Sequence, residues 1–120
     1  MATEGVVKQA LGVPALLVKA GVSTETQILI GPDDGAPNFV MRRFVMGVGG
    51  GMPRHTNLVE HEQFVVRGKA AVTIGNTVHH VSEGDALLIP GGIPHSYEVK
   101  QAPFEFLCIV PNNEDKIEPC

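Results

Sequence analysis

The chain has 120 residues, 43% of them hydrophobic, and its formal net charge of −4 is spread along the sequence with no basic run. This length predicts one domain around a single core, and the charge argues against nucleic acid or an anionic membrane surface as a partner. The longest apolar run near the N-terminus, residues 13–18, is too short for a signal peptide or a membrane helix, and two cysteines give no disulfide framework, so a cytoplasmic location is expected.

Glycine and proline punctuate the sequence throughout, with 14 and 9 residues respectively, and separate short apolar runs. This pattern is typical of an all-β fold with many turns. Strands are predicted, in chain order, over residues 15–19, 26–31, 38–48, 59–67, 69–74, 77–82, 85–90, 94–100 and 104–110. Gly75-Asn76 is a two-residue hairpin signal, and the polar residues 112–120 are expected to form a mobile tail. The spacing predicts a double-sheet jelly roll that can enclose a cavity.

Three histidines recur where such a barrel could aim them at one point. His55 and Asn57 stand two residues apart and would share a face of an extended segment. His61 enters from the following strand, and His95 comes after a Gly/Pro turn later in the chain. Neutral imidazoles suit Zn, Cu, Ni and Fe, and three of them that leave a position open are what a reactive metal requires. We therefore predict a metal centre, in which Asn57 is either a direct ligand or a hydrogen-bond partner of a bound water.

The same two stretches resemble the sequence motifs of the cupins. Residues 84–95 fit the motif G-x5-P-x-G-x2-H-x3-N through its histidine, with Val99 where asparagine is usual. Residues 49–68 fit G-x5-H-x-H-x3-4-E-x6-G less closely, because Asn57 stands in place of the second histidine. The glutamate position falls on His61 with a three-residue gap and on Glu62 with a four-residue gap. Counting back from the last glycine of the motif favours His61.

The sequence around these motifs is most similar to that of small bacterial one-domain cupins in which four histidines hold a transition metal such as manganese. The resemblance covers about residues 16–111 and implies one cupin domain over 1–120, a jelly-roll barrel or double-stranded β-helix, with 1–15 as an N-terminal arm. It further implies one divalent transition metal, Mn or Fe in function, with Zn, Ni or Cu possible as purified. It also implies a homodimer in which N-terminal strands add to the partner's sheet.

Strand parity predicts which other side chains face the metal or the cavity. Tyr97 shares a face with His95, and Gln63 shares one with His61. On the last strand the inward side chains are expected to be Phe104, Phe106 and Cys108.

Arg42 and Arg43 are adjacent, so one of them must point into the fold or its rim; the resemblance favours Arg42, with Met46 on the same face. The predicted pocket is apolar, with one cation and a few polar groups, as small-molecule sites usually are. Burial in such surroundings favours an inert thiol at Cys108 over a nucleophile.

A site with three histidines and no carboxylate leaves a divalent ion its full charge and makes it a stronger Lewis acid. We therefore predict a metal-dependent oxidoreductase of dioxygenase type acting on a small, partly apolar enol, phenol or alkene, with Arg42 or Tyr97 steering an oxyanion. The alternatives are a metal-assisted isomerisation or cyclisation without a redox step, and a non-catalytic module that binds a small ligand or a metal. The fold alone distinguishes none of these.

Overall fold

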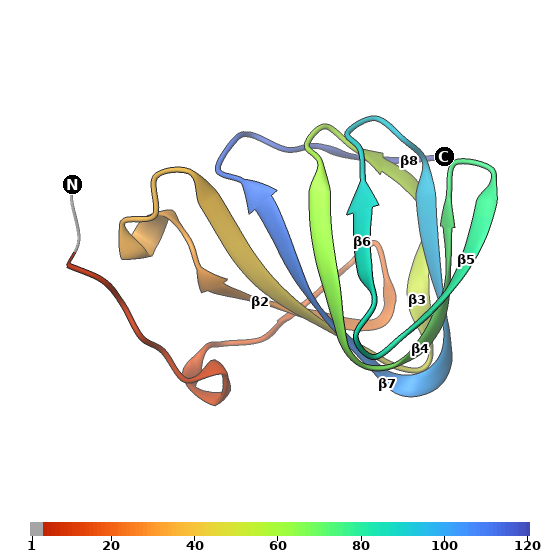
Figure 1. The fold of residues 1–120 in the computed structure, drawn as a ribbon, viewed down its shortest axis with the longest axis horizontal. Coiled ribbons are helices and arrows are strands. Elements are labelled where there is room, and N and C mark those ends of the chain that lie inside the picture. The colour runs from red at the N-terminus through yellow and green to blue at the C-terminus, as the bar shows by residue number, and fades with distance from the viewer. Residues whose placement is uncertain (1–3) are drawn as a thin grey trace.

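The computed structural model describes residues 4–120, which consist mainly of antiparallel strands wound into a barrel (Figure 1). The helical elements in this part of the chain are two short 3-10 turns, Ala10–Gly12 and Pro32–Asp34. The strands in chain order are β1 Leu16–Leu17, β2 Val22–Ile30, β3 Phe39–Asn57, β4 His61–Ile74, β5 Thr77–Ser82, β6 Ala86–Ile89, β7 His95–Pro111 and β8 Ile117–Pro119. The all-β jelly roll predicted from the sequence is confirmed.

Two long central strands, β3 and β7, organise the sheet. The strand order is β1-β2-β3-β7-β4-β5, with β6 added to β4 and β8 added to β3. β4 bends along its length, so that its first residues pair with β6 and its last residues pair with β5. Figure 1 shows the long strands curving together at the bottom of the barrel, while β2 and the start of β3 extend away from it beside the N-terminal arm. This curvature leaves an interior between the strands.

Three strands run further than the sequence predicts. β3 continues from 38–48 to Asn57, β4 joins the predicted strands 59–67 and 69–74, and β7 joins 94–100 and 104–110. Gly51 and Gly68 have φ values of +148° and +84°, and the pairing with β7 shifts register close to each of them. The glycines therefore bend these strands where the sequence pattern predicts that they end.

The core lies on the inner faces of β3, β4 and β7. Its largest fully buried apolar side chains are those of Phe104, Phe106, Met46, Ile89, Val65 and Val72. Met46 is paired with Phe104 across β3 and β7. The aromatic rings of Phe44 and Phe106 stack with their centroids 5.1 Å apart. The rings of Tyr97 and Phe106 also stack, with their centroids 5.5 Å apart. These side chains belong to one buried cluster in the interior of the barrel.

Both ends of the described chain are tied to the barrel. The Gln27 side-chain amide on β2 donates to the carbonyl oxygens of Ala10 and Val13, at 2.7 and 2.8 Å, and so holds the N-terminal arm. At the other end, residues 112–120 differ from the predicted mobile tail, because β8 pairs with the end of β3 at 55–57. The polar composition of the tail does not predict this pairing. The Asp115 carboxylate supports it by accepting a hydrogen bond from the backbone N–H of Leu58 at 2.8 Å.

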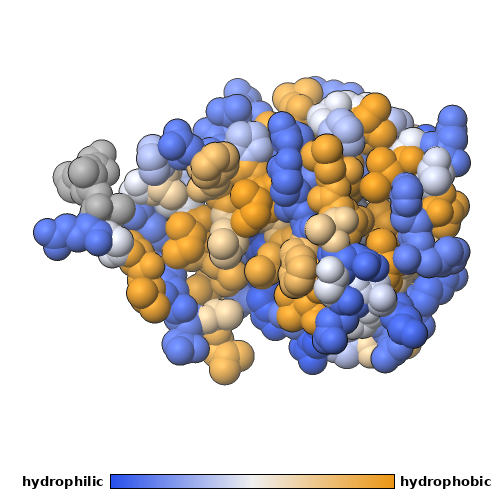
Figure 2. Space-filling model, in the orientation of Figure 1, coloured by the Kyte–Doolittle hydropathy of each residue, from blue (hydrophilic) through white to orange (hydrophobic). Residues whose placement is uncertain are grey.

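The surface mixes apolar and charged side chains, and the face in Figure 2 shows apolar patches interrupted by polar residues. Within residues 4–120, no helix has the length and apolar character needed to cross a membrane.

Candidate metal centre

The three predicted histidines and Asn57 lie together at one end of the barrel interior. His55 and Asn57 are near the end of β3, His61 is the first residue of β4 and His95 is the first residue of β7. His55 and His95 face each other directly in the β3–β7 register. Their ring centroids are 4.2 Å apart, and those of His61 and His95 are 6.0 Å apart. All four side chains are at least 95% buried.

The backbone fixes the tautomer of each histidine in the same way. The Nδ1 atoms of His55, His61 and His95 lie 2.9, 3.0 and 3.0 Å from backbone carbonyl oxygens. In each case the carbonyl belongs to the residue two positions earlier in the chain. A carbonyl can only accept, so each Nδ1 carries the proton and donates it. Each Nε2 therefore keeps a free lone pair, which is the arrangement seen in histidines that ligate metals.

Electrostatics keeps two of these imidazoles neutral. Burial, assisted by the positive charge of Arg42, lowers the pKa of His61 to about 4. Burial also lowers the pKa of His95. At neutral pH these rings are therefore uncharged and their lone pairs are available.

Asn57 presents an unsatisfied oxygen to the same space. Its Nδ2 donates to Asp115 at 3.0 Å, which fixes the orientation of the amide. Its Oδ1 is buried and has no hydrogen-bond partner among the described residues. A buried carbonyl oxygen without a partner costs about 1–3 kcal/mol, and a metal ion or a metal-bound water at this point would remove that cost. The four side chains therefore fit a divalent transition metal in donor type and tautomer.

The residues fit a metal in the type and tautomer of their donor atoms, but these atoms are not yet gathered around one point. Residues 4–120 contain no group of three His, Cys, Asp or Glu side chains already drawn together as a metal site. An ion would have to draw the three imidazoles closer. Glu62, the alternative to His61 in the motif register, is exposed on the opposite face of β4, beside Glu60, whose hydrogen bond raises the pKa of Glu62.

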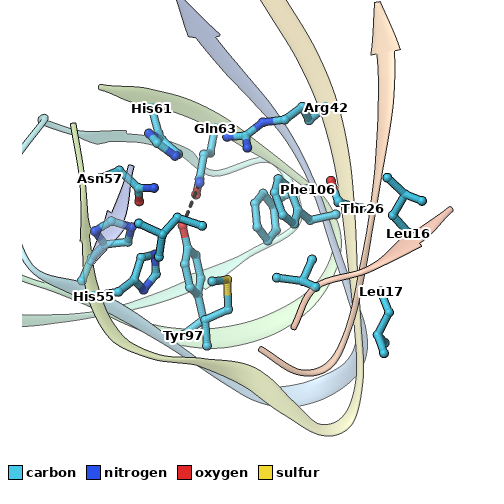
Figure 3. Close-up of a pocket in the computed structure, with 15 residues that line it drawn as sticks. Leu16, Leu17, Thr26, Arg42, His55, Asn57, His61, Gln63, Tyr97 and Phe106 are labelled. Atoms are coloured by element: carbon cyan, nitrogen blue, oxygen red, sulfur yellow. Dashed lines mark hydrogen bonds between the residues drawn. The ribbon is translucent and has the colours of Figure 1, made fainter. Parts of the chain in front are cut away.

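The donors open into a cavity of about 250 Å³. Its lining residues are Leu16, Leu17, Val18, Thr26, Arg42, Phe44, Met52, His55, Asn57, His61, Gln63, His95, Tyr97, Phe106 and Ile117. Figure 3 shows His55, His61 and Asn57 at one end of this space, Gln63 and Tyr97 beside them, and Thr26 and Leu16 towards the other end, with the Arg42 side chain reaching from its strand towards Gln63. The cavity therefore has a polar end with the candidate metal donors and a more apolar end, with the Arg42 guanidinium between them.

Tyr97 and Gln63 form a fixed pair beside the histidines. The Gln63 amide donates to the Tyr97 hydroxyl oxygen at 2.7 Å, which leaves the phenolic proton free to be donated (Figure 3). Burial raises the pKa of Tyr97, so the phenol stays protonated. Burial also raises the pKa of the Cys108 thiol despite the neighbouring Arg42 and Gln63. Tyr97 is therefore a hydrogen-bond donor in this space, and Cys108 is a neutral thiol.

Strand parity predicted the face of each side chain but not its depth in the barrel. Arg42, Gln63, Tyr97 and Phe106 line the cavity. Met46, Phe104 and Cys108, predicted as pocket residues, point inward as expected but are sealed in the core and do not line the cavity. The reason is that they lie where β3, β4 and β7 pack most closely and side chains already fill the interior.

Several lining residues were not predicted. Leu16, Leu17 and Thr26 come from β1 and β2, and Ile117 comes from the tail. No periodic signal in the sequence places the tail over the cavity. Asp115, which orients Asn57, was missed for the same reason.

Comparison with known proteins agrees with this architecture. The Cupin_2 family, described as a cupin domain, matches residues 42–110. No curated protein gave a match. Among solved structures, the polyketide cyclase RemF from Streptomyces resistomycificus is similar with 26% identity and a TM-score of 0.84, over 95% of this chain and 85% of that one.

Two further structures show the same likeness. A cupin-2 domain protein from Rhodospirillum rubrum has 24% identity and a TM-score of 0.82, over 100% of this chain and 83% of that one. A cupin 2 domain-containing protein from Halorhodospira halophila has 29% identity and a TM-score of 0.75, over 82% and 70%. The match of the family to more than half of the sequence, together with the observed barrel, shows that this chain belongs to the Cupin_2 family of cupin domains.

Proposed function

We propose that this protein is a metal-dependent enzyme that promotes a cyclisation or isomerisation of a small enolisable carbonyl compound without a redox step. The observation that carries the proposal is the set of three imidazoles whose Nδ1 atoms are all tied to backbone carbonyls, beside the unpartnered Oδ1 of Asn57. The likeness to a polyketide cyclase supports cyclisation as the reaction class.

A divalent ion held by these residues would supply a Lewis acid that polarises a carbonyl oxygen. The chain's own side chains would do the remaining work. The phenolic O–H of Tyr97 donates a hydrogen bond to an oxygen of the ligand, and Gln63 holds the phenol in position for that contact. The apolar side chains of Leu16, Leu17 and Phe106 line this part of the cavity and would contact the apolar part of a ligand.

The dioxygenase-type oxidation predicted from the sequence is the second candidate. It is supported by the neutral donor set, which contains no carboxylate among its three histidines and Asn57 and opens onto the cavity. Both reactions would use the same residues, so the metal and oxygen requirements must separate them.

The test uses protein stripped with a chelator and reloaded with Zn, Mn or Fe, then incubated with a panel of 1,3-diketones and aryl β-keto esters. Zn²⁺ has no redox chemistry, so turnover by the Zn form under nitrogen supports the non-redox proposal. Turnover that needs Fe or Mn together with O₂, and consumes O₂, supports the dioxygenase. Equal turnover by stripped protein would contradict both. A variant in which His80 is replaced by Gln is a matched control, because His80 is exposed on β5 outside the cavity.

A further inference from the structure

Arg42 is a cation inside the cavity with no anion to balance it. Its Nε is buried and has no hydrogen-bond partner. Its Nη2 donates only to the sulfur of Cys108, at 3.3 Å. The guanidinium lies 5.0 Å from the centroid of the Phe44 ring. Among residues 4–120, Arg42 takes part in none of the ion pairs.

The neighbouring arginine, Arg43, has a structural role and is paired with a carboxylate. Arg43 points to the outside of the barrel and donates to the carboxylate of Glu105 at 2.8 Å and to Gln27 at 2.7 Å. Glu105 is shared with Arg67 at 2.7 Å. The two adjacent arginines therefore differ in kind, because one is neutralised by the protein and the other is not.

A buried guanidinium with an unused N–H is costly unless an anion reaches it. Arginine also presents its N–H groups in a planar fork that matches a carboxylate or a similar oxyanion. Cys108, its protein partner, is a neutral thiol and supplies no counter-charge. Because Arg42 lines the cavity, the missing anion would have to come from the ligand.

The cavity wall beside Arg42 is aromatic. Phe44 and Phe106 are stacked at an interplanar angle of 10°, and Phe106 and Tyr97 at 8°. All three residues line the cavity. These rings stack on one another and the Arg42 guanidinium lies over Phe44, so a ligand meets mainly their edges. Ring edges favour the face of a planar, conjugated ligand over a puckered aliphatic one, because aromatic edges and π-faces attract each other.

We infer that the ligand of this cavity is a small, planar, conjugated acid whose anionic oxygens bind Arg42 while its other end faces the histidines. This assignment rests on the proposed function in taking the cavity as the substrate site. It adds the substrate class, an aromatic or conjugated carboxylate or enolate, and makes Arg42 the residue that selects for charge.

Ligand binding can be measured by the intrinsic fluorescence of a single residue, Tyr97. The chain has one tyrosine and no tryptophan, so intrinsic fluorescence reports Tyr97 in the cavity. Metal-free protein is titrated with benzoate, with the neutral isostere benzamide and with the puckered cyclohexanecarboxylate. We expect benzoate to bind at least about tenfold more tightly than benzamide, as for other hydrogen bonds to charged groups, and more tightly than cyclohexanecarboxylate.

Variants then assign the preference for acid. In R42Q the ratio of benzoate to benzamide affinity should fall to about one, and in R42K, which keeps the charge but not the fork, it should be intermediate. K69Q removes an exposed charge from β4 outside the cavity and should leave the ratio unchanged. Thermal melts show whether each variant is folded. The wild-type ratio needs no variant, so a folding failure does not remove the test.

Wild-type protein that binds benzamide as tightly as benzoate would overturn the inference, and so would R42Q protein that keeps the wild-type ratio. Tighter binding of cyclohexanecarboxylate than of benzoate would overturn the planar class. Repeating the titrations with Zn-loaded protein separates this inference from the proposed function. An acid preference that appears only with Zn and survives in R42Q places the anion on the metal, which overturns the role of Arg42 but supports the metal centre. An acid preference in metal-free protein supports Arg42 even if no metal binds.

Discussion

At the scale of single residues, Asn57 distinguishes this chain from cupins with four histidines at the motif positions. One half of its amide is bound to Asp115 and the other half faces the cavity without a partner. An amide oxygen is a weaker donor to Zn, Ni or Cu than an imidazole nitrogen. An ion at this site would therefore be held less tightly than with a histidine at position 57.

We expect Asn57→His to bind a transition metal more tightly than the parent, and Asn57→Ala to bind it more weakly. The reason is that the first change restores a ring nitrogen on the same face of β3 and the second removes the only donor at that position. Titration of stripped protein with Zn²⁺ or Ni²⁺ by calorimetry measures both. A His variant with unchanged affinity would mean that position 57 does not contact the ion.

Asp115 should matter to the metal although it does not face it. Its carboxylate accepts from Asn57 Nδ2 and from the backbone N–H groups of Leu58 and Val59, and so holds the Asn57 oxygen towards the cavity. Loss of such an orienting group typically costs 10–100-fold in metal affinity. We expect Asp115→Ala to weaken Zn²⁺ binding by about tenfold or more. The matched control is Glu114→Ala, an exposed carboxylate one residue away; equal effects of the two variants would show that general charge is responsible.

At the scale of elements, glycine positions decide how the strands close into a barrel. Gly51 has a φ of +148°, and a Cβ there would overlap the carbonyl oxygen of Tyr97 on β7. Gly49 has a φ of +70° but open space around it. The comparison of the two separates a steric clash from conformational strain.

We expect Gly49→Ala to lower the free energy of unfolding by about 1–2 kcal/mol, the cost of a left-handed residue. Gly51→Ala should cost about 3 kcal/mol or more, because backbone must move as well. Urea denaturation measures both values. Equal losses would mean that β3 and β7 can separate at this point without penalty.

Glu105 joins three strands on the outside of the barrel. On β7, it binds Arg43 of β3 at 2.8 Å and Arg67 of β4 at 2.7 Å. The hydrogen bond from Arg43, with help from Arg67, holds the pKa of Glu105 below its usual value. A carboxyl whose pKa is lower in the folded than in the unfolded state stabilises the fold above the unfolded pKa, and this contribution disappears as the pH falls through the folded pKa.

We therefore expect Glu105→Gln to be less stable than the parent at pH 7, by about 1–3 kcal/mol. The difference should be constant down to about pH 4.5, the ordinary pKa of glutamate, and should shrink at lower pH as the parent becomes protonated. Urea denaturation at several pH values measures the difference. A gap that stays the same in acid would show that the charge on Glu105 is not what joins the strands.

At the scale of the whole molecule, the site joins the ends of three strands, so an ion bound there should stabilise the fold. His55, His61 and His95 belong to β3, β4 and β7. A ligand that binds only the folded state at a hundredfold excess over its Kd adds about 2.7 kcal/mol. We expect the melting temperature to fall by several degrees when the metal is removed with a chelator. The decrease should be absent in His95→Ala and preserved in His80→Gln; a decrease that persists in the His95 variant would exclude this site as its cause.

The residues that the sequence located best are those fixed by local spacing. The alternation along a strand put Tyr97 on the face of His95, and the gap before Gly68 favoured His61 over Glu62, which lies on the exposed face. Alternation says nothing of depth, so it could not separate Met46 in the core from Arg42 in the cavity. The contact of Asp115 with Asn57 joins residues 58 positions apart, and no local pattern encodes such a pairing. The homodimer and the cytoplasmic location stay predictions, and light scattering would test the first.

The C-terminal segment that contains β8 lies on the outside of the barrel and also contacts the candidate metal centre and its cavity. Ile117 lines the cavity, and the Asp115 carboxylate accepts a hydrogen bond from the Asn57 side-chain amide beside the histidines. The backbone N–H of Cys120 donates to the backbone carbonyl oxygen of Arg54 at 3.0 Å. The pairing of β8 with β3 also holds the segment, although most of its side chains are exposed. A ligand in the cavity would contact Ile117 and would therefore help to hold the tail in place. Cleavage by a nonspecific protease within 112–120 should be slowest when metal and ligand are both present, so limited digestion followed by mass spectrometry would report whether the cavity is occupied.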